Sequence, residues 1–185
     1  SDLTGAGSKA WTGITASADF TDLLATVDGG GQIWRSTNSG GNWTVLSVSP
    51  SRSWRQIAPN SAFDKFAAVA WSSYLYQSLN NGTTWSQITA AGVRSWEGIC
   101  VSADFTQMAA TVSHRYPWVS HDSGASWSEL TSAGSRSWSI MDSTADFSML
   151  VAVVYGGNIY HSVYDGPIDA STTWTATGPV TQLSL

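Results

Sequence analysis

Charged side chains are scarce in this sequence. They make up 11% of its 185 residues, whereas an average soluble domain has about 25%. The eight basic and thirteen acidic residues give a net charge of -5, which argues against a nucleic-acid binder with a basic face. The single cysteine, Cys100, excludes an internal disulfide and a multi-cysteine zinc site. No apolar run approaches the ~20 residues of a membrane-spanning helix, so we expect no transmembrane segment.

Tryptophan and small residues are abundant instead. The chain has 11 Trp and 17 Gly, together with many Ser and Thr residues, and this composition forms helices poorly. It favours an all-β fold of short strands joined by tight turns. The low charge is also typical of an extracellular or lumenal surface, which is the localisation that we expect.

An internal repeat of about 42 residues runs through the sequence. Such self-similarity is the strongest available indication of architecture. Trp11 recurs as Trp54, Trp96 and Trp138, each time within a phrase such as SKAW or SRSW. Three further series keep nearly the same spacing: Trp43, Trp85, Trp127 and Trp174; Ser36, Ser78, Ser120 and Ser162; and the aromatic positions Trp34, Tyr76, Trp118 and Tyr160.

Each repeat divides into four strand-like pieces. Turn-forming Ser, Asn and Gly residues separate these pieces, and four strands in about 42 residues is the size of one β-propeller blade. Since a lone blade cannot bury both of its faces, the blades must stack around an axis. We therefore predict a β-propeller whose second blade has strands at about 54–59, 66–71, 74–78 and 84–89.

The repeats predict one propeller domain but leave open how its ring is completed. Four blades can close on themselves, or they can be part of a larger ring that a second chain or a longer array completes. Residues 3–11 repeat the pattern of residues 130–138, so residues 1–7 are either the remnant of a preceding blade or a linker. The predicted domain is 1–185, with repeats at about 8–50, 51–92, 93–134 and 135–180.

The turn before the second Trp of each repeat carries a motif. In the second repeat it reads Ser-Leu-Asn-Asn-Gly-Thr-Thr-Trp over 78–85. This phrase resembles the Asp-box, or BNR repeat, of propeller families such as the sialidases and the photosystem II assembly factor. The resemblance implies a folding element in which Asp or Asn accepts backbone hydrogen bonds and Gly takes a positive φ. The matching positions are Ser36, Asn38, Gly40, Trp43, Ser78, Asn80, Gly82, Trp85, Ser120, Asp122, Gly124 and Trp127.

The fourth copy of the motif is irregular. Tyr164 stands where Asp or Asn is expected, and extra residues delay Trp174. The other turns supply at most one carboxylate each, which is too few oxygen ligands for calcium. The three histidines, His114, His121 and His161, occupy different repeat positions. We therefore predict neither a metal site nor a cofactor.

No catalytic constellation is recognisable. Sialidases share the Asp-box, but they also need an arginine triad, a tyrosine nucleophile and an N-terminal arginine phrase that is missing here. Xyloglucan hydrolases with similar repeats place two acidic residues across a cleft between two propellers. Asp19, Asp104 and Asp146 recur at one repeat position and are expected to form turns. We predict no catalytic residues; the alternative is a fragment of a larger glycoside hydrolase, with Glu97 and Glu129 among the carboxylates to test.

A repeated basic position is the best candidate for ligand binding. It lies two residues before the first Trp, in the link between blades, and takes four of the eight basic residues. In a closed ring these groups would surround the axis and attract an anion. The hairpins between the second and third strands open on the same face, where aromatic rings suit sugars or protein contacts. The predicted ligand-binding residues are Lys9, Arg52, Arg94, Arg136, Trp71 and Tyr155.

A structural explanation of the basic position stays open. Duplication alone can repeat it, and it can pair with an acidic group or a backbone carbonyl of the adjacent blade. The recurrent Trp positions are expected in the core between blades. Asn42 and Asn81 begin N-x-S/T sequons and are possible glycosylation sites.

The sequence as a whole predicts a non-enzymatic recognition module. Its expected ligand is a glycan or an acidic protein surface, bound at the basic and aromatic face. The alternative is a scaffold for protein assembly, including self-assembly through exposed strand edges or blade faces.

Overall fold

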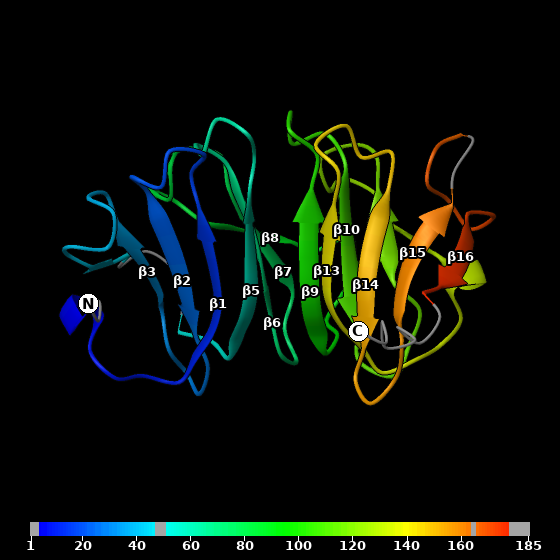
Figure 1. The fold of residues 1–185 in the computed structure, drawn as a ribbon, viewed down its shortest axis with the longest axis horizontal. Helices are drawn as coiled ribbons and strands as arrows, with labels where there is room; N and C mark the ends of the chain where they lie inside the picture. The colour runs from blue at the N-terminus through cyan, green and yellow to red at the C-terminus, as the bar shows by residue number, and fades with distance from the viewer. Residues whose placement is uncertain (1–3, 47–50, 164–165, 178–185) are drawn as a thin grey trace, which may run out of the picture.

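The computed structural model describes residues 4–46, 51–163 and 166–177. These residues form four antiparallel sheets of four strands each, and within every sheet the strands pair in sequence order. Each sheet corresponds to one repeat, so the predicted all-β fold of four-stranded blades is confirmed; we call the sheets blades 1 to 4 (Figure 1). The parts of the predicted domain at 1–3, 47–50, 164–165 and 178–185, including the irregular turn at Tyr164, lie outside the described residues.

Every blade starts from an inner strand that begins at the first Trp of its repeat. The inner strands are β1 (Trp11–Ala16), β5 (Trp54–Pro59), β9 (Trp96–Val101) and β13 (Trp138–Ser143). The second strands are β2 (Leu23–Val27), β6 (Phe66–Ala70), β10 (Met108–Val112) and β14 (Leu150–Val154). The third strands are β3 (Ile33–Ser36), β7 (Leu75–Ser78), β11 (Trp118–Ser120) and β15 (Ile159–Val163). The outer strands are β4 (Thr44–Val45), β8 (Ser86–Ile88), β12 (Ser128–Glu129) and β16 (Thr173–Ala176).

Across residues 4–46, 51–163 and 166–177, helix is limited to two short 3-10 turns, η1 (Thr4–Ala6) and η2 (Thr131–Ala133). Among the described residues no helix has the length and apolar character needed to cross a membrane.

The hydrophobic core lies between neighbouring blades. The second strands of blades 1 to 3 are buried along their whole length, because a sheet with neighbours on both faces loses its solvent-exposed side. Trp54, Trp96 and Trp138 are fully buried, as predicted, whereas Trp11, the first of the series, is only half-buried on the end blade. The outer-strand rings Trp85 and Trp127 are half-buried and pack against the same clusters.

Hydrogen bonds within the turn hold each predicted Asp-box hairpin. In blade 1 the Asn38 Oδ1 accepts from the Asn42 N–H at 2.7 Å, and the Ser36 Oγ accepts from the Gly40 N–H at 2.9 Å. Gly40 has a φ of +86°, which a residue with a Cβ resists. Asn80 and Asp122 accept from Thr84 and Ser126 in the same way, at 2.9 and 2.8 Å. Side-chain oxygens at these positions therefore accept backbone hydrogen bonds within the turn, and the assignment of the turns to the Asp-box stays a prediction.

The described blades form an open row rather than a closed four-blade ring. The inner strands pack in chain order, β1 on β5, β5 on β9 and β9 on β13. Blade 1 and blade 4 lie at opposite ends of the long axis (Figure 1). Each end blade therefore has one face without the neighbour that the inner blades have.

Candidate functional site

The inter-blade links and the hairpins between second and third strands share one end of the blades. The Trp71 N–H donates to the Ser53 carbonyl at 2.9 Å, and the Tyr155 N–H donates to the Ser137 carbonyl at 2.8 Å. Backbone bridges also pair Ser73 with Arg94, one blade along. The sequence argument that these two kinds of loop lie together thus agrees with the structure.

Each of the four predicted basic residues lies over the third-strand aromatic ring of its own blade. Such cation–π contacts stabilise a charge that is partly removed from water. The Arg94 guanidinium carbon is 4.0 Å from the Trp118 ring centroid, the closest approach of the four. The other three pairs are Lys9 with Trp34 at 4.5 Å, Arg52 with Tyr76 at 5.8 Å, and Arg136 with Tyr160 at 4.6 Å.

Arg52 differs from its equivalents in its hydrogen bond. The Nε of Arg94 and that of Arg136 donate to carbonyls at the end of the preceding blade, Ala91 at 3.0 Å and Ala133 at 3.1 Å. The Arg52 Nε instead donates to the Tyr76 hydroxyl at 3.0 Å. Two of the four groups therefore link adjacent blades through backbone carbonyls, an alternative that the sequence left open.

A groove of about 460 Å³ brings two of the predicted binding residues together on blade 2. Arg52 and Trp71 line it, with the rings of Tyr74 and Tyr76 beside them. The Trp71 side chain is 39% exposed. Burial would raise the pKa of Tyr76, but hydrogen bonds from Arg52, Ser73 and Gln87 outweigh it and lower that pKa. Serine hydroxyls complete the lining at Ser51, Ser53, Ser72 and Ser73.

The remaining predicted binding residues do not line this groove. Tyr155 is 85% exposed on the equivalent hairpin of blade 4, and Lys9, Arg94 and Arg136 lie on the other blades. The predicted ligand-binding role of all six residues, including Arg52 and Trp71 in the groove, stays a prediction.

A charged cluster adjoins the groove through Trp71. The Arg55 side chain, at the start of β5, lies between two carboxylates: its Nη1 is 3.1 Å from Asp28 Oδ2, and its Nε is 3.6 Å from Glu97 Oε2. The Arg55 guanidinium also lies 5.2 Å from the Trp71 ring centroid. Trp71 therefore contributes to the lining of the groove and also contacts the cation of this cluster.

The two carboxylates of this cluster are shifted in opposite directions. Burial raises the pKa of Glu97; the Arg55 charge opposes this shift and the Asp28 charge adds to it. The Gly29 N–H, which donates to Asp28 at 2.6 Å, lowers the pKa of Asp28. The structure thus brings Glu97 together with a carboxylate, but with a guanidinium between them.

Sequence reasoning missed Arg55. It directly follows the first Trp of its repeat, where the other repeats have Thr12, Glu97 and Ser139. The available signal was that this repeat position holds arginine in blade 2 and glutamate in blade 3, which can form an ion pair. Their meeting depends on how adjacent inner strands align, which a repeat pattern does not specify.

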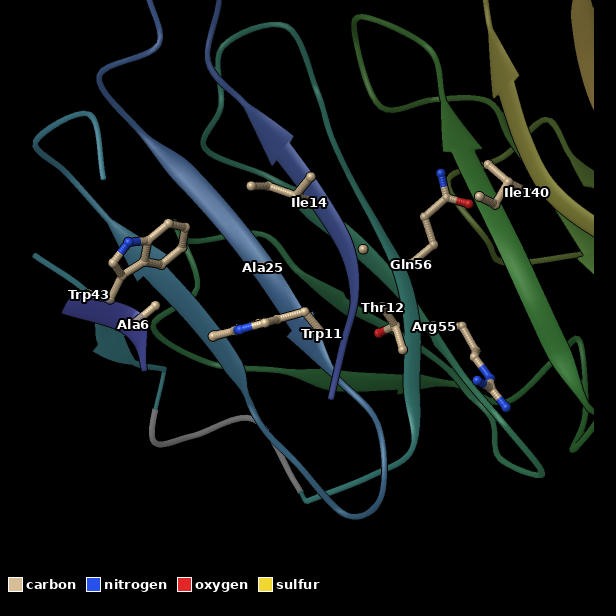
Figure 2. A pocket seen from close by; sticks show the side chains of 10 residues that line it. Ala6, Trp11, Thr12, Ile14, Ala25, Trp43, Arg55, Gln56 and Ile140 are labelled. Atoms are coloured by element: carbon tan, nitrogen blue, oxygen red, sulfur yellow. The ribbon is translucent and has the colours of Figure 1, made fainter. Parts of the chain in front are cut away.

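A second hollow of about 570 Å³ lies over β1 (Figure 2). Its lining is mainly apolar and includes Trp11, Ile14, Trp43 and Ile140. Figure 2 shows the rings of Trp11 and Trp43 on the same side of β2, close to Ala6. The hollow also extends along the inner strands of other blades, because Arg55 and Gln56 of β5 and Ile140 of β13 line it.

The other sequence candidates lie in the turns or on the surface. Both sequon residues, Asn42 and Asn81, are exposed; the Asn81 Oδ1 accepts a hydrogen bond from Arg35 at 2.8 Å, and their glycosylation stays a prediction. Asp19, Asp104 and Asp146 accept hydrogen bonds from backbone N–H groups two residues on. Within the described ranges, no three His, Cys, Asp or Glu side chains form a group that could hold a metal ion.

Known proteins match the structure of this chain but not its sequence. No protein-family model and no curated protein matches it. Among solved structures, the GH74 enzyme of Niastella koreensis superposes with a TM-score of 0.68 at 15% identity, over 87% of this chain and 30% of that one. A chain of the nidogen/laminin complex superposes with a TM-score of 0.70 at 16% identity, over 83% of this chain and 60% of that one. YCF48 from Cyanidioschyzon merolae superposes with a TM-score of 0.63 at 12% identity, over 91% of this chain and 56% of that one.

These likenesses establish the propeller fold. They carry no functional assignment, because the sequence identities are this low. The chain spans about a third of the enzyme's length and somewhat over half of the other two.

Proposed function

We propose that this chain is a non-enzymatic recognition module that binds an acidic glycan in the blade 2 groove. The observation that carries the proposal is the shared lining of this groove by the Arg52 guanidinium and the half-exposed Trp71 ring. A guanidinium binds carboxylate or sulfate in bidentate fashion. An indole face packs against the C–H face of a sugar ring, and serine hydroxyls supply further hydrogen bonds. The expected setting is extracellular or lumenal.

Differences between the blades support a single site of this kind. The position of Trp71 is Asp28 in blade 1, Ser113 in blade 3 and Tyr155 in blade 4. The guanidiniums of Arg94 and Arg136 are directed to backbone carbonyls. Only blade 2, among the described blades, combines a Trp at this position with an arginine in the same groove.

The test is binding of sulfated and uronic-acid glycans, on an array and then by calorimetry. Trp71→Ser should weaken binding at least tenfold, about 1.4 kcal/mol, and the change is conservative for the fold because blade 3 has Ser113 there. Arg52→Ala should weaken binding to a similar degree. The matched controls are Tyr155→Ser and Arg94→Ala, which remove the equivalent ring and the equivalent cation–π pair outside the groove.

Three results would contradict the proposal. Unchanged affinity in Trp71→Ser would remove the groove from recognition. Loss of binding in Tyr155→Ser instead would move the site to blade 4. Absence of binding to every glycan would favour the scaffold alternative, in which the partner is a protein surface.

The hydrolase alternative has one observation in its favour. Asp28 and Glu97 meet at Arg55 with pKa values shifted in opposite directions, and acid–base pairs require such a difference. If the chain cleaves a bound glycan, Glu97→Gln should abolish cleavage and retain binding. The recognition proposal expects no cleavage by either form.

A further inference from the structure

The three interfaces inside the chain show what covers a blade. Between blades 2 and 3, the second strand of blade 2 contributes Ala67 and Val69, and blade 3 contributes Trp96, Ile99 and Phe105. The interfaces between blades 1 and 2 and between blades 3 and 4 use the equivalent positions. One face of every blade is thus built to receive the following blade, and the other face to receive the preceding one.

Blade 1 leaves its preceding-blade face open. Ile14, three residues after the first Trp, is 68% exposed, whereas its equivalents Ile57, Ile99 and Met141 are at most 2% exposed. Phe20 is 67% exposed, and its equivalents in the other three blades are buried. Ile14 also contributes to the lining of the apolar hollow, together with Trp11 and Trp43 of the same blade (Figure 2).

Blade 4 leaves its following-blade face open. Val151 is 40% exposed, while Leu24, Ala67 and Ala109 at the same position are fully buried. Ile159, the first residue of β15, is 48% exposed, and the matching Ile33 and Leu75 are fully buried. In the β14 strand only Leu150 and Ala152 are buried, whereas β2, β6 and β10 are buried throughout.

The N-terminal segment already imitates the end of a preceding blade on the open face of blade 1. Its 3-10 turn η1 matches η2, which ends blade 3 and covers blade 4. The Trp11 indole N–H donates to the Gly7 carbonyl at 3.3 Å, as the Trp138 indole N–H donates to the Gly134 carbonyl at 3.0 Å. Both glycines have a positive φ, +68° at Gly7 and +76° at Gly134. The open face is therefore arranged as an interior blade interface.

We infer that a second copy of this chain docks head-to-tail, with the open face of its blade 4 against the open face of blade 1. The contact repeats an interface that the chain forms three times within itself, between the same repeat positions. The two open faces have apolar residues at the repeat positions that are buried in the internal interfaces. They lie at opposite ends of the row of blades (Figure 1). Two such contacts close a ring of eight blades from two copies, since heterologous contacts close when the rotation permits. This surface is separate from the blade 2 groove.

The test is the mass of the full chain in solution, by analytical ultracentrifugation and native mass spectrometry over a concentration series. The expected species has twice the 19.7 kDa chain mass. Ile14→Lys and Val151→Lys each put a charge on one open face, and each should leave a monomer. Leu79→Lys is the matched control: Leu79 is 57% exposed in a blade 2 turn, away from both faces, and this variant should remain a dimer.

Mixing the two charged variants tests the head-to-tail arrangement. The Ile14→Lys chain keeps an intact blade 4 face and the Val151→Lys chain keeps an intact blade 1 face, so a mixture should form a heterodimer that neither variant forms alone. Circular dichroism of each variant checks that the monomer is folded. A wild-type chain that is monomeric at every concentration would overturn the inference. So would a Val151→Lys variant that still dimerises, because that result means like faces pair.

Discussion

Arg94 and Trp118 form the tightest of the four cation–ring pairs, with the guanidinium carbon 4.0 Å from the indole centroid. The Arg94 Nε also donates to the Ala91 carbonyl, at the end of the preceding blade. One side chain thus joins the third strand of its own blade to the blade before it. Arg94, and Arg136 through its bond to the Ala133 carbonyl, therefore contribute to contacts between successive blades, whatever else they bind.

Replacing Arg94 with alanine should reduce stability. The variant loses a partly buried cation–π pair and a charge-assisted hydrogen bond to a carbonyl, together about 1 to 2 kcal/mol. Urea denaturation with a two-state fit gives the difference. Arg94→Lys should recover only part of the loss, because an ammonium group lacks the planar stack. A denaturation midpoint equal to that of the wild type would show that the pair contributes nothing.

Gly98 is where two inner strands approach most closely. A Cβ at this position would lie 2.7 Å from the Ser139 carbonyl oxygen and 2.8 Å from the Met141 backbone nitrogen. Because backbone atoms of the next blade cannot move aside cheaply, Gly98→Ala should cost about 1 to 3 kcal/mol. Ile140→Val, at the equivalent exposed position of blade 4, should change stability by less than about 0.5 kcal/mol. Equal effects of the two substitutions would contradict the close approach.

The turn carboxylates predict a loss of stability in acid. Hydrogen bonds from the Ser126 side chain and backbone N–H lower the pKa of Asp122 from 3.8 to about 2, and Asp19, Asp104 and Asp146 have similarly lowered values. A lowered folded-state pKa stabilises the fold above the unfolded pKa, and this contribution is lost as pH falls through the folded value. The urea concentration at the unfolding midpoint should therefore decrease as the pH is lowered from about 4 to about 2.

The variant Asp122→Asn isolates one of these groups. Blades 1 and 2 have Asn38 and Asn80 at that position, and the Asn80 amide donates to Thr84 at 2.9 Å, so the turn accepts asparagine. The variant should lose less stability than the wild type between pH 4 and pH 2. An unchanged acid slope would mean that Asp122 does not contribute.

The ion cluster predicts the sign of two pKa changes at Glu97. Removing the guanidinium with Arg55→Met should raise the Glu97 pKa further, because Arg55 favours the ionised carboxylate. Asp28→Asn should lower it, because the negative charge of Asp28 disfavours ionisation. Carbon-detected NMR titration of the side-chain carboxyl measures both shifts. Shifts of the same sign would show that the cluster is not assembled as described.

The strands of the second blade were predictable from the repeat and its turn residues. The prediction at 54–59 matches β5, and those at 66–71 and 74–78 match β6 and β7 within one residue. The outer strand is shorter than predicted, because the hydrogen bonds of the Asn80 turn extend to Thr84. The shared end of the links and hairpins also followed from blade topology alone.

The site was only partly predictable. Arg52 and Trp71 were identified as binding candidates, and they line one groove. The groove depends on how loops of neighbouring blades meet, and the placement of Arg55 between Asp28 and Glu97 depends on residues from three different blades. Contacts of this kind are set by the rotation from blade to blade, and the sequence spacing contains no measure of that angle.

The sequence by itself determined the blade: its size, its four strands, its Trp positions and the turns in which Asn or Asp and Gly have fixed roles. These are local properties, because hydrogen bonds within a few residues and a fixed repeat length specify them. Only the tertiary structure decided how many faces remain open. Ile14 and Val151 have sequence equivalents that are buried, and they are exposed because no fifth blade packs on either end of the described row. Burial is a property of neighbours, and a repeat specifies its own residues but not what packs beside the first and the last copy.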